Sequence, residues 1–162
     1  MGTGKPVPMS KDICYLFHVG VWKRNNPNID IRRDFPPSLA KIIRSKQIMK
    51  VVSAPENDAK WLFEDFGITM TGFVDIQAFA IQLGENKTGL DSLASKFIQN
   101  WTPKNKFMYK SAWNSTLTKE MIEYAAYDAY ASYHIFNKMF PNLFKQKYIN
   151  MSQSHNLPQL EA

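Results

Sequence analysis

The sequence predicts an α/β fold in which a sheet is flanked by helices. Short apolar runs rich in β-branched and aromatic residues occur at 13–19, 48–54 and 72–76, which is typical of buried strands. Amphipathic helical patterns lie between and after these runs, and strands that alternate with helices favour a sheet with helices packed on its faces. The 162 residues, 44% of them hydrophobic, suffice for one domain with a core of its own.

The N-terminal part is expected to contain one strand between two irregular segments. Residues 1–12 hold two Pro and two Gly and are expected to form a loose arm. Ile13–Val19 (ICYLFHV) is predicted to be a buried strand, and residues 23–37, with three Pro, are predicted to be a loop. Cys14 lies in the apolar run and is expected to be buried. Because it is the only cysteine, it excludes an internal disulfide and a zinc site built on cysteines.

Four short helices are predicted in the middle of the chain. Ser38 is expected to cap the first helix, and the second, from about 57 to 66, is expected to end at Gly67. The pattern is again helical from 78 to 83 and from 89 to 97. The positions expected to face the core are Leu39, Ile42 and Ile43 in the first helix, Ala59, Leu62, Phe63 and Phe66 in the second, and Leu90, Leu93, Ala94 and Phe97 in the last.

A long helix is predicted to begin after Thr118, a residue type that caps helix N-termini well. Glu120 and Glu123 suit the positive end of the helix dipole. Apolar residues then repeat every three or four positions, and the polar segment 141–162 is expected to be a frayed tail. The face predicted to be buried consists of Ile122, Ala126, Ala129, Tyr133, Phe136 and Phe140.

Three residues of this pattern could form a site. Tyr124 and Asp128 are four residues apart, so they lie on one face of the long helix, where a phenol and a carboxylate can hold a metal ion and a water against one phosphate. Asp58 follows the strand 48–54 at the start of a helix, and ligands gather beyond the C-terminal ends of parallel strands. Taken singly, Asp58 also suits the N–H groups of its own helix, and Tyr124 and Asp128 suit a surface pair.

Other polar and aromatic residues are expected to have structural roles. Trp101 and Trp113 are expected to be packing anchors, and Asp75 is expected to be a strand-end or turn residue. His18 and His134 lie in apolar surroundings, where a histidine is most often a hydrogen-bonded core residue.

Several motifs follow one another in a fixed order. Residues 51–68 read VVSAPENDAKWLFEDFGI with Asp58 inside, Trp113 precedes a Leu-Thr pair, and residues 124–129 read YAAYDA. Together, over about 13–140, they resemble the DEDDy group of 3′-5′ exonucleases, the ribonuclease D and Werner-helicase exonuclease type. In this resemblance Asp58 matches the second-motif aspartate, and the YAAYDA segment matches the third motif.

The resemblance implies an N-terminally incomplete ribonuclease H-like α/β domain at 13–140, with a mixed sheet flanked by helices. In this family two Mg²⁺ or Mn²⁺ ions, about 3.5–4 Å apart, act on the terminal phosphodiester, and such hard cations prefer carboxylate oxygens. The resemblance implies that Asp128 is a direct metal ligand and Asp58 a ligand reached partly through water. It also implies that Tyr124 orients the attacking water and helps to deprotonate it.

The first motif of the family, Asp-x-Glu on the first strand, has no counterpart in this sequence. Its strand and the next one would precede Ile13, and residues 1–12 contain no Asp-x-Glu. The strands 13–19 and 48–54 would then lose the neighbours that they share, which leaves backbone groups unpaired. Four outcomes are open: the two strands close up on each other, the arm supplies a strand, another polypeptide fills the gap, or the chain is a fragment of a longer exonuclease.

Nucleic acid is the expected partner. The formal charge of +6 and the pI near 9.4 favour an anionic ligand, and the resemblance implies single-stranded DNA or RNA 3′ ends held by aromatic and basic side chains. Because the first-motif acids are absent, we expect little or no nuclease activity from this polypeptide alone. The alternative is a catalytically degenerate exonuclease domain that binds nucleic acid or a protein partner.

The sequence also bears on location. No apolar stretch approaches the length of a membrane span, and the N-terminus lacks the apolar segment of a signal peptide. The protein is therefore expected to be intracellular, in the nucleus or the cytoplasm, without a membrane partner.

Overall fold

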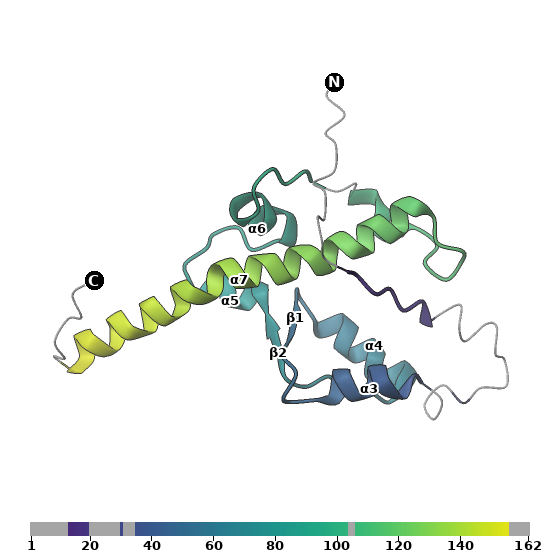
Figure 1. Ribbon diagram of the computed structural model, residues 1–162, viewed down its shortest axis with the longest axis horizontal. Helices are drawn as coiled ribbons and strands as arrows, with labels where there is room; N and C mark the ends of the chain where they lie inside the picture. The colour runs from purple at the N-terminus through teal and green to yellow at the C-terminus, as the bar shows by residue number, and fades with distance from the viewer. Residues whose placement is uncertain (1–12, 20–29, 31–34, 104–105, 156–162) are drawn as a thin grey trace, which may run out of the picture.

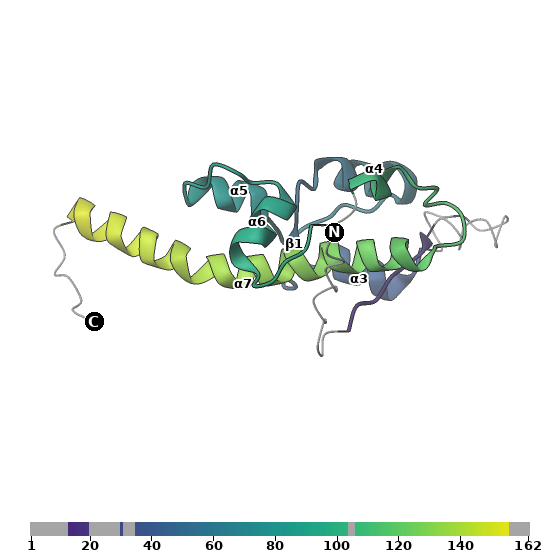
Figure 2. The same cartoon turned by 90° about the horizontal axis from the view of Figure 1, so that it is seen from above.

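One long helix organises the molecule. The computed structural model describes residues 13–19, 30, 35–103 and 106–155, and within these ranges helix α7 (Lys119–His155) runs across the whole structure. The strands and the helices α3 and α4 lie on one side of α7 in Figure 1, and α6 lies on the other side; Figure 2 shows the same arrangement from above.

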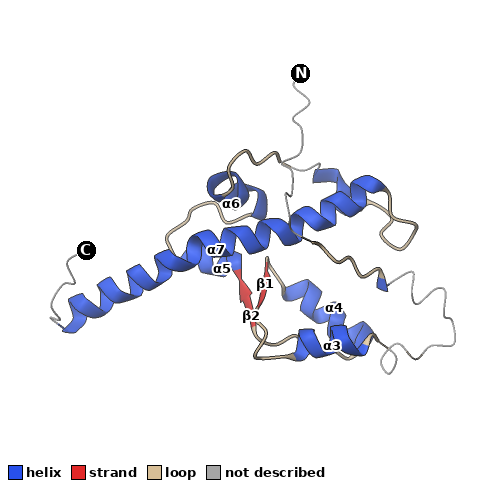
Figure 3. Ribbon diagram, in the orientation of Figure 1, coloured by secondary structure: helices blue, strands red, loops and turns tan. Residues whose placement is uncertain are grey.

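The sheet lies next to the middle of α7. Strand β1 (Lys50–Val52) pairs in parallel with β2 (Phe73–Asp75), with Lys50 opposite Phe73 and Val52 opposite Asp75. Figure 3 shows the two short strands between α7 and the helices α3 and α4. Gly72 leads into β2 with a positive φ of 62°, and its carbonyl accepts a hydrogen bond from the Lys50 N–H at 2.9 Å. In the described part of the chain the sheet therefore consists of one parallel pair.

The strand predicted at Ile13–Val19 is wrong. This segment has no strand structure, and the side chains of Ile13 and Tyr15 are 77% and 76% exposed. Cys14, expected to be buried, is exposed as well. A strand persists only when another strand satisfies its backbone groups, and among the described residues nothing pairs with this segment. Of the outcomes left open by the sequence, the closing up of 13–19 onto β1 is not what the structure shows.

The helices α3 (Pro37–Arg44) and α4 (Glu56–Phe66) begin and end much as predicted. Pro37 opens α3, and no side chain caps it, so the cap predicted at Ser38 is wrong. Gly67 ends α4 in the left-handed conformation, with a φ of 64°, as predicted. Phe63 was expected to be buried and is 60% exposed. No residue of α4 is fully buried, and Phe66 at its end packs against the smaller core around Phe35.

The main core lies where α7 meets α5 (Ile76–Gln82) and α6 (Leu90–Phe97). Its buried residues come from all three helices, and the aromatic rings of Phe79 and Phe136 lie 5.7 Å apart between centroids. A smaller core gathers Phe35, Ala40 and Ile68 near α3. The buried residues of the main core are Ile76, Phe79, Ala80, Leu93, Ala94, Ala131, Ile135, Phe136 and Met139.

The predicted buried face of α7 is only partly correct. Ala126 and Phe136 are buried, whereas Ile122 and Tyr133 are 46% and 57% exposed. The helix has apolar residues on more than one side, and packing of α5 and α6 selects the side with Ile135 and the residues one turn from it. The helix also continues past Pro141 to His155 instead of ending in a frayed tail. The predicted arm at 1–12 lies outside the described residues.

The α/β class is confirmed, with a small sheet flanked by helices. Within the described ranges, no helix combines the length and the apolar character that crossing a membrane requires.

Candidate functional site

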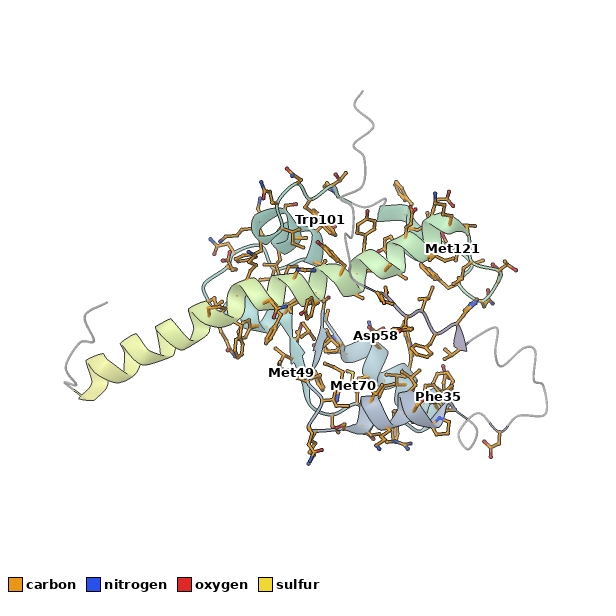
Figure 4. All side chains as sticks on the ribbon, in the orientation of Figure 1. Phe35, Met49, Asp58, Met70, Trp101 and Met121 are labelled. Carbon is orange, nitrogen blue, oxygen red and sulfur yellow. The ribbon has the colours of Figure 1, made fainter. Side chains whose placement is uncertain are left out.

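Asp58 lies where the chain leaves the sheet and enters a helix. It is the third residue of α4, which follows β1 after a short turn, and Figure 4 shows it on α4 below α7. Partial burial raises the pKa of the Asp58 carboxyl, and the negative charge of Asp128 raises this pKa further. The two acids are therefore near enough for their charges to interact, although they are far apart in the sequence.

Tyr124 and Asp128 lie one turn apart on α7, and both side chains are half-buried. The phenol ring of Tyr124 lies against Trp113, with 6.1 Å between ring centroids. Burial raises the pKa of the Tyr124 hydroxyl, and the charges of Asp128 and Asp91 add to this effect. A phenol with a raised pKa stays protonated at neutral pH, so Tyr124 can donate a hydrogen bond to an oxygen bound at this site.

The beginning of α7 is fixed by its cap. The Thr118 hydroxyl accepts a hydrogen bond from the Met121 N–H at 3.3 Å, as expected for an N-cap residue. The pKa of the Glu120 carboxyl is lowered by hydrogen bonds from the N–H of Glu120 itself and from the Thr118 side chain. Because a helix is rigid over one or two turns, this cap also sets the position of Tyr124.

Asp75 supports the turn that carries Asp58, and it acts as a helix cap. Its carboxylate accepts hydrogen bonds at 3.0 Å from the N–H groups of Ala54 and Gln77, and at 3.4 Å from that of Ala78. Ala54 lies in the turn between β1 and α4 with a positive φ of 51°, a conformation that costs free energy for a residue with a Cβ. The prediction that Asp75 is a turn residue rather than a ligand agrees with these contacts.

Asp91 was not predicted as a site residue, yet its charge acts on Tyr124. One carboxylate oxygen of Asp91 is buried without a hydrogen-bond partner among the described residues. It belongs to the first turn of α6, the helix that packs against α7. The sequence contained one signal for it, an acid at the start of a helix in the segment that joins the second and third motifs.

The other residues expected to be structural lie in packing or hydrogen-bonding positions. Trp101 and Trp113 pack their rings against Tyr127 and Tyr124 of α7. His18 Nε2 lies 2.7 Å from the carbonyl oxygen of Trp113, which ties the N-terminal segment to the loop before α7.

A cavity of about 450 Å³ lies between residues 13–15 and α7. It is lined on the α7 side by small and aromatic residues, and His134 stacks there with 4.1 Å between its ring centroid and that of Tyr130. Asp58, Asp128 and Tyr124 are not among its lining residues, so this cavity is separate from the acidic pair.

The carboxylates of Asp58 and Asp128 are the kind of ligand that a hard cation prefers, but they are only two. Asp58 and Asp128 offer carboxylate oxygens, and the repulsion between their charges would be relieved by a bound Mg²⁺ or Mn²⁺. In the described ranges, no three His, Cys, Asp or Glu side chains are grouped closely enough to hold a metal ion. The residues present therefore fit an incomplete metal site.

The family model of a 3′-5′ exonuclease matches residues 28–143, which is more than half of the chain. The chain belongs to the 3′-5′ exonuclease family. Both Asp58 and Asp128 fall inside the matched region. The resemblance proposed from the motifs is thereby confirmed.

Curated relatives carry the same designation. A 3′-5′ exonuclease of Arabidopsis thaliana is 29% identical over 128 residues, 77% of this chain and 40% of the relative. The bifunctional 3′-5′ exonuclease/ATP-dependent helicase WRN of Mus musculus is 29% identical over 135 residues, 81% of this chain and 9% of the relative. The chain thus spans less than half the length of these relatives.

Solved nuclease structures share the fold. The apo form of a nuclease has a TM-score of 0.62 at 21% identity, covering 73% of this chain and 57% of that one. Brucella melitensis NrnC bound to pGG has a TM-score of 0.60 at 18% identity with the same coverage. These likenesses show the fold, and the exonuclease domain is accordingly a ribonuclease H-like α/β structure.

Proposed function

We propose that this exonuclease domain, at 13–140, binds single-stranded nucleic-acid 3′ ends at Asp58 and Asp128, and that the polypeptide alone hydrolyses them weakly or not at all. The observation that supports the proposal is the electrostatic coupling of Asp58 with Asp128. Two carboxylates held close to each other and partly withdrawn from water are unfavourable unless a cation binds them. Such an arrangement is typical of a site that is completed by a divalent ion.

Each residue has a role in the proposed chemistry. Asp58 and Asp128 would hold Mg²⁺ or Mn²⁺, which in a two-metal site activates a water and stabilises the leaving 3′ oxygen. Tyr124, one turn before Asp128, would orient the attacking water through its protonated hydroxyl. The half-buried position of Tyr124 against Trp113 restricts the ring to few orientations, which favours a defined hydrogen bond.

Weak hydrolysis follows from the number of acids. Two ions about 3.5–4 Å apart need several bridging carboxylates, and the sequence contains no Asp-x-Glu at any position. Asp91 adds a charge near Tyr124 but does not form a three-residue metal group with Asp58 and Asp128 in the described part of the chain. One ion can therefore bind and position a phosphate, while the second ion lacks ligands.

The test uses 5′-labelled single-stranded DNA and RNA oligonucleotides with Mg²⁺ or Mn²⁺. We expect binding, measured by fluorescence anisotropy, without shortening of the oligonucleotide on a denaturing gel. Asp128→Ala should weaken the metal-dependent part of the binding. Robust shortening from the 3′ end that Asp128→Ala abolishes would contradict the weak activity and establish an exonuclease. Failure of the wild-type chain to bind either nucleic acid would refute the whole proposal.

A second candidate function is binding of a protein partner by a degenerate exonuclease domain. It is favoured by the exposed apolar side chains at 13–17 and by the outer edge of β1, which no described strand covers. An exposed strand edge presents N–H and C=O groups that another extended chain can pair with. Under this alternative, the double substitution of Ile13 and Tyr15 by Glu abolishes capture of the partner and leaves oligonucleotide affinity unchanged.

A further inference from the structure

Trp61 differs from the other tryptophans that the structure describes. Its side chain is 57% exposed and makes no ring contact with any described residue, whereas Trp101 and Trp113 each pack against a tyrosine of α7. A large exposed aromatic side chain beside a ligand site is a common feature of single-strand binding proteins, where bases stack on it.

The helix places Trp61 next to Asp58. Trp61 is three residues after Asp58 in α4, so the two side chains lie on the same side of the helix. Side chains in an α-helix lean toward the N-terminus, and a residue covers the turn that precedes it. The indole of Trp61 therefore leans toward the turn that carries Asp58. Phe63 is five residues after Asp58, about 140° around the helix, and it points to another side.

The charges around Trp61 favour a base over a phosphate as its contact. Asp58 lies one turn before Trp61 and is assigned to the proposed cation site, whereas Asp65 lies one turn after Trp61, where its carboxylate repels a phosphate. The adjacent cation, Lys60, lies 3.8 Å from a carboxylate oxygen of Glu64. A neutral indole between two acids offers a nucleotide its aromatic face, which stacks with any base.

We infer that Trp61 is the stacking platform for the terminal base of a single-stranded 3′ end whose last phosphate is held at Asp58 and Asp128. The inference rests on the proposed function and adds a residue that determines how the end of the strand is positioned. Because stacking does not read base edges, the site should accept all four bases while requiring that a base be present. The terminal phosphate and its base are joined through one sugar, so both can be held from one turn of α4 and the facing acid of α7.

The experiment compares Trp61→Ala, Trp61→Phe and the matched control Phe63→Ala. Phe63 is suitable because it is 60% exposed on the same helix but on another side. The probe is a 5′-labelled single-stranded oligonucleotide with phosphorothioate linkages, which resist cleavage, in the presence of Mg²⁺. Each variant is also tested with an otherwise identical oligonucleotide that lacks its 3′-terminal base. Circular dichroism spectra confirm that the variants fold like the wild type.

We expect Trp61→Ala to raise the Kd about tenfold, Trp61→Phe to retain most of the affinity, and Phe63→Ala to bind like the wild type. Removal of the terminal base should raise the Kd of the wild type by a similar factor and leave the Kd of Trp61→Ala unchanged. Equal affinities of the wild type and Trp61→Ala, or equal losses in Trp61→Ala and Phe63→Ala, would overturn the inference and leave the proposed function standing. If the wild type binds no oligonucleotide, the proposed function fails and this inference fails with it.

Discussion

The carboxylates of Asp58 in α4 and Asp128 in α7 are near enough for the charge of one to raise the pKa of the other. Partial burial of Asp58 contributes more to this shift than the charge does. The two helices are far apart in the sequence, so only the folded chain brings these acids together. The repulsion between the two acids and the partial burial of Asp58 give the first two predictions.

Replacement of Asp58 by Asn should stabilise the protein at neutral pH. The pKa of Asp58 is raised above its ordinary value of 3.8, so ionisation costs more in the folded state than in the unfolded chain. Protonation of Asp58 therefore favours the folded state. Its contribution to the free energy of unfolding is fully present below pH 3.8 and is lost as the pH rises through the folded-state pKa. At pH 7 the charge thus destabilises the fold. Because the Asp58 carboxyl is only partly buried and is screened by water, we expect a rise in Tm of only about 1–2 °C.

The control for this substitution is Asp65→Asn, which removes the same charge two turns further along α4. We expect the gain of Asp58→Asn over this control to disappear below pH 3.8, where both states of the wild type bind the proton. Thermal unfolding followed by circular dichroism at several pH values measures the difference. A gain that is independent of pH would show that the charge of Asp58 is not its source.

Divalent cations should stabilise the wild-type chain. An ion that binds only the folded state adds RT ln(1 + [ion]/Kd), so a concentration about tenfold above the Kd should raise the Tm by about 2–5 °C. Asp58→Asn and Asp128→Asn each remove one ligand and should abolish most of this rise. Scanning calorimetry with Mg²⁺, Mn²⁺ or EDTA measures it. The hypothesis of a metal site would be rejected if the ions stabilised the wild type and both variants equally.

Asp75→Ala should destabilise the turn between β1 and α4. The substitution removes three accepted hydrogen bonds, including the one from the strained Ala54, and we expect a loss of about 2 kcal/mol in the free energy of unfolding. Asp75→Asn keeps one acceptor oxygen and should lose less. Urea denaturation measures both values. Equal losses in the two variants would mean that the hydrogen bonds of Asp75 do not support this turn.

Gly72→Ala should be the more severe of two glycine substitutions. A Cβ at Gly72 would lie 2.8 Å from the carbonyl oxygen of Ser45 and 3.0 Å from the Cα of Lys46, and the φ of +62° is itself unfavourable for alanine. We expect a loss of about 3 kcal/mol. Gly89 has an ordinary φ of −60°, and a Cβ added there would have no atom within 4 Å, so Gly89→Ala should cost only about 0.5–1 kcal/mol, which is what alanine costs at a helix N-cap.

The two glycine variants are compared by urea denaturation. Gly72 immediately precedes β2, and its carbonyl accepts the Lys50 N–H at 2.9 Å, so a backbone shift at this position in Gly72→Ala should also weaken the pairing of β1 with β2. Similar stabilities for the two variants would show that the close contact at Gly72 is relieved by a small backbone shift.

Local patterns predicted the elements whose cause is local. Gly67 ends α4 because a residue without a Cβ accepts the left-handed conformation, and Thr118 caps α7 because its hydroxyl reaches the Met121 N–H. The pair Tyr124 and Asp128 could be placed on one face from helix geometry alone. Periodicity was a weaker guide to burial, since α7 has apolar residues on several sides and the packing of α5 and α6 selects among them.

Elements that depend on distant partners were predicted poorly. The segment 13–19 has the composition of a strand but no strand structure, because no described strand satisfies its backbone groups. Cys14 and Phe63 are exposed because an apolar side chain is buried only when another element of the fold covers it. Asp91 was missed because its effect on Tyr124 arises from the packing of α6 against α7.

The α/β class and the membership of the exonuclease family could be read from the amino-acid sequence, because motifs and helix periodicity depend on the residue types at fixed short spacings. The same motifs predict Asp58, Tyr124 and Asp128 as site residues. Folding of the chain was needed to establish that Asp58 and Asp128 interact, that Asp75 holds the turn between β1 and α4, and that Trp61 is exposed beside Asp58. The physical reason is that pKa shifts, burial and strand pairing depend on groups distant in the chain, whose proximity is set by packing.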